Sequence, residues 1–470
     1  MTKEEKIAYF DSIAEKRDGW KKKNSYYYSE LERFLRFVIP IDSSVLEIGC
    51  GTGDFIGHLN PRRGMGIDFS KGMIEIAKEK YPEYIFLVDD AEDLHLSEKF
   101  DYVIMSDLVG HLTDVWQAFR CLQRVTKEET RVIITQFNYF WEPLFRLGEK
   151  MRLKMPQHYQ NWLSSEDIEN LLNLNGYEVV QKGMRLLFPK KILLFSSLLN
   201  RFIAKLPIIR HLCLVEYIVA KEKPKSETKE YSCSVIIPCK DEVGNIEGCV
   251  ERTQDMGNKT EIIFVDGNST DGTVEKIEEM IKKHKGKKDI KLIHQGSGKG
   301  KGDAMKKGFA VATGDIFFIL DADLTVPPED LPKFYLAIAE GRGEFINGTR
   351  LVYPMEKQAM RTLNLIANKL FGIIFSWLLE QRIKDTLCGT KVLFKRDYER
   401  IAENRSFFGD FDPFGDFDIL FGAAKLNLKI VEIPIRYKER TYGDIKIQRF
   451  RHGLLLLKMT FVAFRRLKLN

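Results

Sequence analysis

The sequence predicts two consecutive domains of the α/β class. The chain has 470 residues, about three times the roughly 150 residues of one typical domain. In both halves, apolar runs rich in β-branched residues alternate with helical patterns, which is typical of sheets with mostly parallel strands. Between the halves, residues 221–230 hold seven charged residues, one proline and no apolar residue, so this segment has nothing to bury. We therefore expect domains over residues 1–220 and 231–470, joined by a charged linker over residues 221–230.

Ten apolar runs are expected as strands, five in each half. In the first half they cover residues 44–48, 64–67, 85–88, 102–105 and 132–137. In the second half they cover residues 233–237, 261–265, 291–294, 316–320 and 430–437. The two halves share no motif, and no internal repeat is visible.

The charge of the chain is concentrated at its C-terminal end. With 73 basic and 67 acidic residues the net charge is +6. Residues 436–470 hold ten Lys or Arg and two Asp or Glu, a balance of +8, so the rest of the chain is at −2. A basic end points to anionic lipid, phosphate or nucleic acid. Because no basic surface interleaved with aromatic residues is evident, we expect no nucleic-acid partner.

The cysteines and the N-terminal residues favour the cytoplasm. The seven cysteines are an odd number and form no C-x-x-C pair, which argues against a disulfide framework and a zinc site. The sequence is charged from its third residue, so no signal peptide is expected.

Three apolar stretches fall short of a membrane span, which needs about 18 or more apolar residues. Residues 192–200 and 370–379 carry no charge but are short, and residues 453–464 are interrupted by Lys458. We therefore expect no transmembrane helix. For residues 192–200, a core helix is at least as good an interpretation as membrane contact.

A glycine-rich loop follows the first predicted strand. Gly49, Gly51 and Gly53 alternate with other residues, so the backbone can turn sharply and approach a ligand closely. Asp68 ends the next strand about 20 residues later, where a carboxylate can accept hydrogen bonds from ribose hydroxyls. Residues 89–92 end the third strand, a suitable edge for an adenine amino group. The G-x-G-x-G spacing differs from the dinucleotide fingerprint.

These segments make the first half resemble class I S-adenosylmethionine-dependent methyltransferases, which have a Rossmann-like fold. The resemblance is carried by VLEIGCGTGDF (45–55), GIDFSKGMIEIAK (66–78), VDDAEDL (88–94) and FDYVIMSDLVGHL (100–112). It implies S-adenosylmethionine as cofactor, bound by Glu47, Gly49, Gly51, Gly53, Asp68, Asp90, Ala91 and Ser106.

The acceptor side of the first half is less defined by its sequence. His111 is a candidate base, and a packed surface histidine is the alternative interpretation. An aromatic N-terminal segment, which includes Tyr9, Trp20 and Tyr27, could cap the cofactor. The aromatic residues of 141–160 are expected to cover the acceptor pocket, and they fit either a small molecule or a lipid.

Acidic clusters in the second half also follow predicted strands, where α/β sheets place ligands. Asp241 and Glu242 follow the first strand, and Asp266 ends the second. Asp321-Ala322-Asp323 follows a strongly apolar strand. Two such carboxylates can anchor a hard divalent cation, which would neutralise charge on a departing nucleoside diphosphate.

The second half resembles family 2 glycosyltransferases of the GT-A fold, and within them polyprenyl-phosphate glucosyl- and mannosyltransferases. The resemblance is carried by SVIIPCKDEVGNI (234–246), EIIFVDGNSTDGT (261–273), GKGDAMKKGFAVATGDIFFILDADL (300–324), NGTR (347–350), DTLCGTKVLFKR (385–396), FGDFDIL (414–420) and VEIPIRYKERTYGDIK (431–446). Gly267 and Ile445 depart from the family pattern, which has aspartate and serine there.

The resemblance implies a set of site residues for a donor of the UDP-glucose or GDP-mannose type. Nucleotide-sugar contacts fall on Pro238, Asp241, Glu242, Asp266, Lys299 and Asp321, and Mg²⁺ or Mn²⁺ on Asp321 and Asp323. Phosphate or acceptor contacts fall on Arg350, Arg361, Lys391, Arg440 and Lys446. Asp416 or Asp418 is the candidate base, and a helix N-cap is an equally good interpretation of Asp416.

We therefore expect a bifunctional enzyme that transfers methyl groups in its first half and hexose, with inversion, to polyprenyl phosphate in its second. A phosphate monoester has a second pKa near ~6 and is already nucleophilic at neutral pH. With a glycan hydroxyl as acceptor instead, Asp416 would be essential, and in a third interpretation one half only binds its ligand. Residues 363–379 and the basic tail are expected to dock on the cytoplasmic leaflet, making the protein peripheral.

Overall fold

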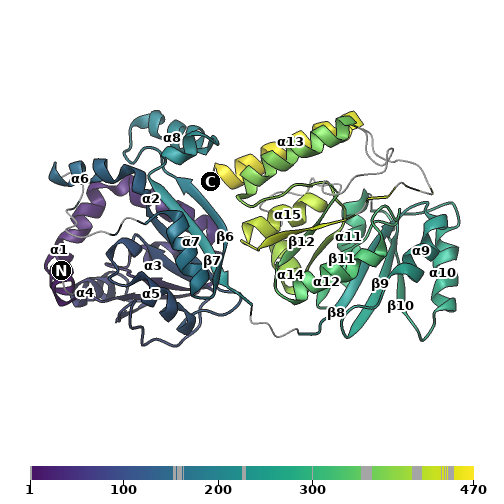
Figure 1. The fold of residues 1–470 in the computed structure, drawn as a ribbon, viewed down its shortest axis with the longest axis horizontal. Coiled ribbons are helices and arrows are strands. Elements are labelled where there is room, and N and C mark those ends of the chain that lie inside the picture. The colour runs from purple at the N-terminus through teal and green to yellow at the C-terminus, as the bar shows by residue number, and fades with distance from the viewer. Residues whose placement is uncertain are drawn as a thin grey trace. The chain divides into compact units, whose positions relative to one another are not determined.

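The chain forms two compact units in the computed structural model (Figure 1). Unit 1 comprises residues 1–223 and 468–470, and unit 2 comprises residues 224–467. The structure describes residues 3–151, 155, 161, 163–224, 229–298, 300–350, 362–404, 415–435, 437, 438, 440, 442 and 449–469. No helix of these residues is long and apolar enough to cross a membrane.

Unit 1 is built on a seven-stranded sheet in the order β3-β2-β1-β4-β5-β7-β6. The first five strands of this order are parallel, and β7 runs antiparallel to both β5 and β6. The strands are β1 (Ser44–Ile48), β2 (Arg63–Asp68), β3 (Ile85–Val88), β4 (Tyr102–Ser106), β5 (Arg131–Phe137), β6 (Tyr177–Arg185) and β7 (Val215–Glu222).

Helices cover this sheet and bury apolar clusters against it. They are α1 (Lys3–Lys23), α2 (Ser25–Val38), α3 (Asp54–Leu59), α4 (Lys71–Lys80), α5 (Val115–Cys121), α6 (Glu142–Lys150), α7 (Ser165–Leu174) and α8 (Leu193–Arg201). The starts of α4 and α7 follow ordinary capping rules. The Ser70 hydroxyl accepts from the Met73 amide at the start of α4, and Ser164 and Asp167 form a capping box at the start of α7.

Unit 2 is built on a second seven-stranded sheet in the order β10-β9-β8-β11-β13-β12-β14. Only β13 runs antiparallel to its neighbours, β11 and β12. The strands are β8 (Ser232–Cys239), β9 (Lys259–Asp266), β10 (Asp289–His294), β11 (Ile316–Ile319), β12 (Phe345–Thr349), β13 (Lys391–Phe394) and β14 (Ile430–Pro434). The helices are α9 (Val243–Arg252), α10 (Thr273–Lys283), α11 (Gly300–Val311), α12 (Leu331–Ala339), α13 (Thr362–Leu379), α14 (Lys395–Glu403), α15 (Asp416–Lys425) and α16 (Arg449–Ala463).

The predicted α/β class with two domains is confirmed, and each of the ten expected strands overlaps a strand of the structure. Four strands were not expected, namely β6, β7, β12 and β13. The segment expected as a linker also begins differently, because Lys221 and Glu222 belong to β7. Lys221 is buried in the sheet beside Glu178 of β6, with its Nζ 3.8 Å from the Glu178 carboxylate. A charged residue can occupy such a position when an opposite charge accompanies it.

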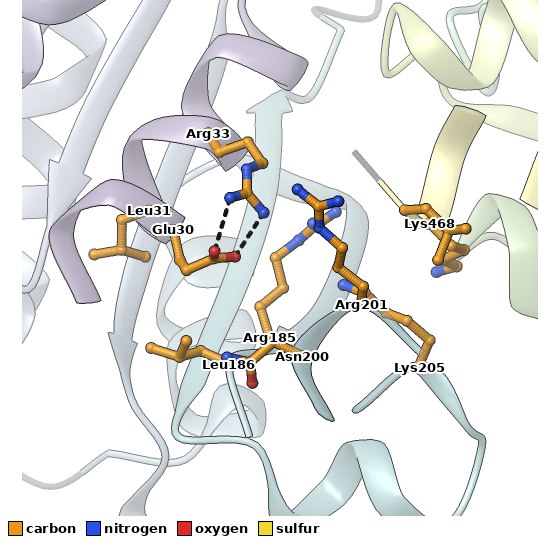
Figure 2. Close-up of a pocket in the computed structure, with 10 residues that line it drawn as sticks. Glu30, Leu31, Arg33, Arg185, Leu186, Asn200, Arg201, Lys205 and Lys468 are labelled. Atoms are coloured by element: carbon orange, nitrogen blue, oxygen red, sulfur yellow. Dashed lines mark hydrogen bonds and ion pairs between the residues drawn. The ribbon is translucent and has the colours of Figure 1, made fainter. Parts of the chain in front are cut away.

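A small pocket of about 20 Å³ lies in unit 1 beside α2 and α8 (Figure 2). Three cationic side chains point toward it, from Arg185 at the end of β6 and from Arg201 and Lys205 in and after α8. Glu30 and Arg33 on α2 line the same pocket and are paired with each other.

Candidate active sites

The glycine-rich loop of unit 1 has the backbone conformation that its glycines permit. Gly49, Gly51 and Gly53 have φ values of +75°, +52° and +77°, which other residues rarely adopt. A Cβ on Gly49 would lie 2.7 Å from the Leu108 side chain, whereas one on Gly51 would meet nothing within 4 Å. Gly49 and Gly51 line a cavity of about 420 Å³. This volume lies in the roughly 300–1,000 Å³ range of small-molecule sites.

Asp68 lies at the carboxyl end of β2 and also lines this cavity. Its carboxylate accepts hydrogen bonds from the backbone N–H groups of Gly51 and Ser70, both at 2.9 Å. Burial raises the pKa of Asp68, and these two hydrogen bonds act in the opposite direction. A carboxylate has about four acceptor sites, so oxygens fixed in this way retain capacity for the hydroxyls of a ribose.

Glu47 lies in β1 directly before the loop and is only 2% exposed. Its Oε2 has no hydrogen-bond partner among the residues that the structure describes. Burial raises the pKa of Glu47 to about 8, while the Lys21 ammonium lowers it. A buried carboxyl oxygen without a partner fits a ligand that supplies a positive amino group. Together with the cavity and Asp68, this donor set fits S-adenosylmethionine.

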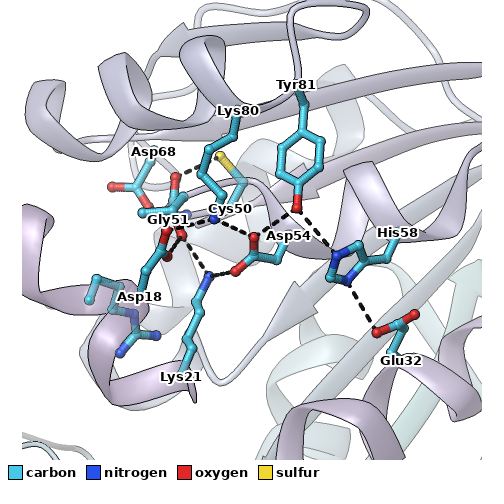
Figure 3. A network of polar contacts seen from close by, with 12 residues as sticks. Asp18, Lys21, Glu32, Cys50, Gly51, Asp54, His58, Asp68, Lys80 and Tyr81 are labelled. Atoms are coloured by element: carbon cyan, nitrogen blue, oxygen red, sulfur yellow. Dashed lines mark hydrogen bonds and ion pairs between the residues drawn. The ribbon is translucent and has the colours of Figure 1, made fainter. Parts of the chain in front are cut away.

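A network of hydrogen bonds and ion pairs connects helix α1 to the glycine-rich loop (Figure 3). The Lys21 ammonium lies 2.8 Å from the Asp54 carboxylate and donates to the Thr52 hydroxyl at 2.9 Å. Thr52 in turn donates to Asp18 at 2.6 Å. Lys80 of α4 lies 2.7 Å from Asp18 and 2.5 Å from Asp54. Two residues of α1 thus hold the loop that follows β1.

The same helix contacts the loops after three further strands. Lys3 pairs with Asp90 after β3, and the Asp11 carboxylate accepts from the Ser70 hydroxyl and the Gly72 amide after β2. Lys6 donates to the His111 carbonyl after β4 at 3.1 Å. Helix α1 therefore covers the carboxyl ends of β3, β2, β1 and β4. The sequence did not single out Asp11, Asp18 or Lys21, because charged residues on a helix usually indicate a solvated face.

The opposite wall of the cavity is aromatic and apolar. The Tyr27 hydroxyl donates to Asp107 at 2.8 Å, and burial together with this carboxylate raises the pKa of Tyr27. Ser106 and His111 also line the cavity, and the His111 ring packs edge-on against Phe10. The remaining wall includes Trp20, Tyr28, Phe137, Leu144, Phe145, Leu147 and Met151.

The sequence-predicted residues of unit 1 therefore divide into two groups. Gly49, Gly51, Asp68, Ser106 and His111 come together around the cavity. Four others do not line its wall: Glu47 and Gly53 lie beneath or beside the loop, Asp90 is paired with Lys3, and Ala91 packs against the core of unit 1.

In unit 2, hydrogen bonds connect the loop after β8 with the loop after β9. The Asp241 carboxylate accepts from the Thr270 amide at 2.9 Å, and the Asp241 amide donates to the Ser269 hydroxyl at the same distance. Asp266 accepts from the Asn268 amide at 3.0 Å. Asp241 has a φ of +50°, a strained value for a residue other than glycine. Pro238 of β8 pairs with β9 in the same region.

The Asp321 and Asp323 carboxylates lie just after β11. The Lys301 ammonium of α11 is 2.7 Å from Asp321 Oδ1. Although burial opposes it, Lys301 holds the pKa of Asp321 below its usual value. Burial and the neighbouring Asp321 raise the pKa of Asp323. Arg440 pairs with Glu242, and its guanidinium lies 3.9 Å from Asp323 Oδ2.

The acidic pair fits a divalent cation as a partial ligand set. Among the described residues, no group of three or more His, Cys, Asp or Glu side chains is arranged to hold a metal. Carboxylate oxygens are nevertheless the donors that Mg²⁺ prefers, and this ion is usually bound by one or two carboxylates plus substrate phosphates and water. A cation here would also relieve the repulsion that raises the pKa of Asp323.

Asp416, the first residue of α15, extends this cluster. Its Oδ2 lies 3.5 Å from the Lys301 ammonium, and its Oδ1 lies 3.6 Å from the ammonium of Lys391, a fully buried residue of β13. Although burial opposes it, Asp321 and Asp416 raise the pKa of Lys301, so Lys301 keeps its proton. The structure thus brings together Asp321, Lys301, Asp416 and Lys391. The sequence missed Lys301 and named Lys299 in its place.

Two further predicted site residues, Arg350 and Asp418, have surroundings that differ from those of the four-residue cluster. Arg350 is held by Asp385 in two contacts of 2.7 and 2.8 Å, and it lies over the Tyr437 ring at 5.0 Å. Asp418 is buried on α15. Lys299, Arg361 and Lys446 lie outside the described residues.

The two sheets, each with polar groups gathered at the carboxyl ends of its central strands, define a tandem of two α/β domains with small-molecule sites. A methyltransferase domain model matches residues 20–182, and a glycosyl transferase family 2 model matches residues 234–401. The first half of the chain thus matches a methyltransferase domain and the second half a family 2 glycosyltransferase, in the order that the sequence predicted.

Characterised relatives match the second half. The chain is 32% identical over 224 residues to the dolichol-phosphate mannosyltransferase of Pyrococcus furiosus, covering 46% of this chain and 59% of that protein. It is 37% identical over 122 residues to the dolichol-phosphate mannosyltransferase of Saccharomyces cerevisiae, covering 25% of this chain and 44% of that protein. The chain thus spans less than two thirds of the length of these relatives.

Solved structures match the first half. A methyltransferase from Thermotoga maritima aligns with a TM-score of 0.37 and 18% identity, covering 47% of this chain and 100% of that one. A putatively assigned methyltransferase from Haloferax volcanii, solved with its activator Trm112, aligns with a TM-score of 0.36 and 15% identity, covering 46% of this chain and 97% of that one.

Proposed function

We propose that the protein is a bifunctional enzyme. Unit 1 transfers a methyl group from S-adenosylmethionine, and unit 2 transfers a hexose, with inversion, from a nucleotide sugar to polyprenyl phosphate. The observation that carries the second activity is the run of alternating charges Asp321, Lys301, Asp416 and Lys391 after β11. The similarity to dolichol-phosphate mannosyltransferases supports the lipid phosphate as acceptor.

In unit 2, Mg²⁺ or Mn²⁺ on Asp321 and Asp323 would neutralise charge on the departing nucleoside diphosphate. Lys301 keeps its ammonium charge at the same place and supplements this neutralisation. Asp241, Glu242 and Asp266, on the loops after β8 and β9, are the proposed nucleoside contacts.

The acceptor phosphate needs positive charge more than it needs a base. Its second pKa lies near ~6, so an oxygen is already ionised at neutral pH. Asp416 has its carboxylate oxygens near two ammonium groups, so its charge is compensated, and a phosphate acceptor does not need it as a general base. We also propose Arg440 as a phosphate contact.

An asparagine at Asp416 tests this assignment. With polyprenyl phosphate as acceptor, the Asp416→Asn variant should retain most of its transfer rate. A loss of 100-fold or more, of the size expected for a missing general base, would favour a hydroxyl acceptor such as a growing glycan.

Membrane contact of unit 2 is part of the proposal. Helices α13 and α16 expose apolar side chains, including Leu370, Ile373, Leu457 and Phe461. Trp377 on α13 stacks on Phe464, which follows α16, with ring centroids 5.7 Å apart. An apolar pair of helices with a basic end suits the anionic cytoplasmic leaflet. Flotation with anionic vesicles tests this idea, which fails if the protein stays in the soluble fraction at low salt.

In unit 1, S-adenosylmethionine would supply an electrophilic methyl group. We propose that the Gly49–Gly53 backbone and Glu47 hold its amino-acid part and that Asp68 binds its ribose. The aromatic wall would shield the bound cofactor from water, and we propose His111 as the base that takes a proton from the acceptor. Calorimetry with S-adenosylmethionine tests the site directly, and an absence of binding would leave unit 1 as a module without this activity.

A donor screen tests unit 2. Purified protein is mixed with Mn²⁺, undecaprenyl phosphate and each common UDP- or GDP-sugar, and release of nucleoside diphosphate is followed. Release that requires both lipid and metal, with one donor, supports the proposal and names the sugar. Release that does not depend on lipid contradicts it.

A further inference from the structure

Unit 1 exposes many large apolar side chains in two segments of its chain. Thirteen large hydrophobic side chains in residues 139–151 and 192–212 are 44% to 87% exposed, among them Leu144, Leu147, Met151, Leu193, Phe195 and Ile208. Scattered single exposures need no explanation, but contiguous apolar patches mark interaction sites. We call these two segments the α6–α8 surface.

The two segments are adjacent in the fold. The Trp141 indole N–H, just before α6, donates to the Leu212 carbonyl at 3.0 Å. The Asn138 side-chain amide donates to the carbonyls of His211 and Cys213 at 3.1 and 2.9 Å. Figure 1 shows α6 and α8 on the same side of unit 1. The exposed residues therefore belong to one surface.

This surface shares residues with the wall of the 420 Å³ cavity. Leu144, Leu147 and Met151 are more than half exposed and at the same time line that cavity. Pro189 and Lys190, which directly precede the second segment, also line the cavity. The apolar wall of the cavity thus continues onto the outer surface.

The charge of the second segment has one sign. Residues 186–212 contain five Lys or Arg and no Asp or Glu. Lys191 and Arg201 are exposed, and Figure 2 shows Arg201 and Lys205 together with Arg185 around one small pocket. An apolar face flanked by cations is the pattern of a segment that lies in the interface of an anionic membrane. A second copy of the same cationic face would be repelled.

We propose that the α6–α8 surface docks unit 1 on an anionic lipid bilayer. Its apolar side chains enter the interface, and the exposed cations Lys191 and Arg201 contact lipid phosphates. The methyl acceptor then enters the cavity from the lipid side and is itself carried on a lipid. Only this last consequence rests on the proposed methyltransferase function of unit 1.

An environment-sensitive dye on an introduced cysteine tests the proposal at this surface. All seven native cysteines are buried, so a cysteine in Leu193→Cys, at a position that is 87% exposed, would be labelled selectively. The matched control is Ile41→Cys, at a position 73% exposed in unit 1 but outside the surface. Both full-length proteins are titrated with vesicles of phosphatidylcholine, with and without phosphatidylglycerol.

We expect the dye at position 193 to brighten several-fold and shift to the blue with anionic vesicles, while the dye at position 41 does not change. No change at position 193 in protein that floats with the vesicles would overturn the proposal, because unit 2 alone would then dock. A blue-shifted dye at position 193 without vesicles would also overturn it, because protein would already cover the surface.

A charge substitution separates docking from cofactor binding. With the dye on Leu198→Cys, a position 52% exposed on the same surface, Leu193→Glu combined with Ile208→Glu should remove the response to anionic vesicles that reports docking of unit 1, and Ile41→Glu should leave this response unchanged. Calorimetry with S-adenosylmethionine is run on the same proteins. Unchanged cofactor binding with lost docking supports the proposal, whereas retained docking refutes it. If the wild type fails to bind S-adenosylmethionine, the proposed function of unit 1 fails while the docking result stands.

Discussion

Glu47 offers a sharp test of the cofactor site, because its protonation should change when a cationic ligand binds. The carboxyl is buried beneath the glycine-rich loop, and its pKa is raised to about 8. At pH 7 such a group is protonated in about 0.9 of the molecules, and at pH 8 in about half. A bound ammonium group favours the charged carboxylate and returns its pKa to the usual range or below.

Binding of S-adenosylmethionine should therefore release about 0.9 proton at pH 7 and about 0.5 proton at pH 8 from the protein. Because binding releases a proton, affinity rises with pH. Between pH 6 and pH 8 the dissociation constant should fall about 50-fold through this group alone. In Glu47→Gln both the proton release and this part of the pH dependence should vanish.

The assay is calorimetric titration in buffers of different ionisation enthalpy. The amino group of the ligand titrates in the same region, so the quantity of interest is the difference between wild type and Glu47→Gln. Equal proton release from the two proteins at pH 7, or an affinity ratio that stays constant from pH 6 to pH 8, would refute the reasoning.

The unliganded protein gives an independent control of the sign. Because the folded-state pKa of Glu47 is raised, the stability that its neutral form contributes is complete below about pH 4.5 and is lost as the pH rises through about 8. Glutamine resembles the neutral form at every pH. The unfolding temperature of Glu47→Gln relative to wild type should therefore increase from pH 5 to pH 8.

Three further predictions concern other parts of the chain. Asp321→Asn should lower metal-dependent release of nucleoside diphosphate by 100-fold or more, whereas Asp303→Asn, which removes only a charge paired with Lys307 on α11, should leave it within twofold. Asp385→Asn leaves the Arg350 charge uncompensated in the interior, so it should lower the free energy of unfolding of unit 2, measured in urea, by about 3–5 kcal/mol. Arg252→Gln breaks a surface ion pair and should lower it by under about 1 kcal/mol. Added salt screens exposed ion pairs, so protease cleavage within α1 should accelerate with KCl concentration, and a rate independent of salt would contradict the polar attachment of this helix.

The sequence predicts well those features that depend on local pattern. The apolar runs locate the central parallel strands, and the glycines and aspartates that follow them lie where the expected ligand loops form. The antiparallel strands β7 and β13 were not predicted. They form by pairing with distant segments, β5 and β11, and the local sequence does not show such pairing. Lys391 in β13 is fully buried, a position that its residue type alone does not suggest.

Contacts between charged residues of distant segments were harder to predict. Lys301 and Asp416 lie close together in the structure but more than a hundred residues apart in the sequence. The residues next to either one give no sign of this contact. Arg350 was expected as a phosphate or acceptor contact, and its pairing with Asp385 was not predicted. In α1, the apolar residues are not gathered on one face, so its sequence gives no sign of where the helix lies against unit 1.

That attachment of α1 has a kinetic consequence. Only Ala14 of this helix is buried. Apart from the ring contacts of Phe10 with Phe69 and His111, the contacts described above between α1 and the four strand-end loops are made through charged side chains. Water can replace each charged partner at modest cost, so these contacts can be released without rearrangement of the core. The contacts are also spread along the helix from Lys3 to Lys21, so they can be released one after another. Product exchange at the cavity could then proceed by successive small steps of detachment, at a rate that depends on the ionic strength of the solution.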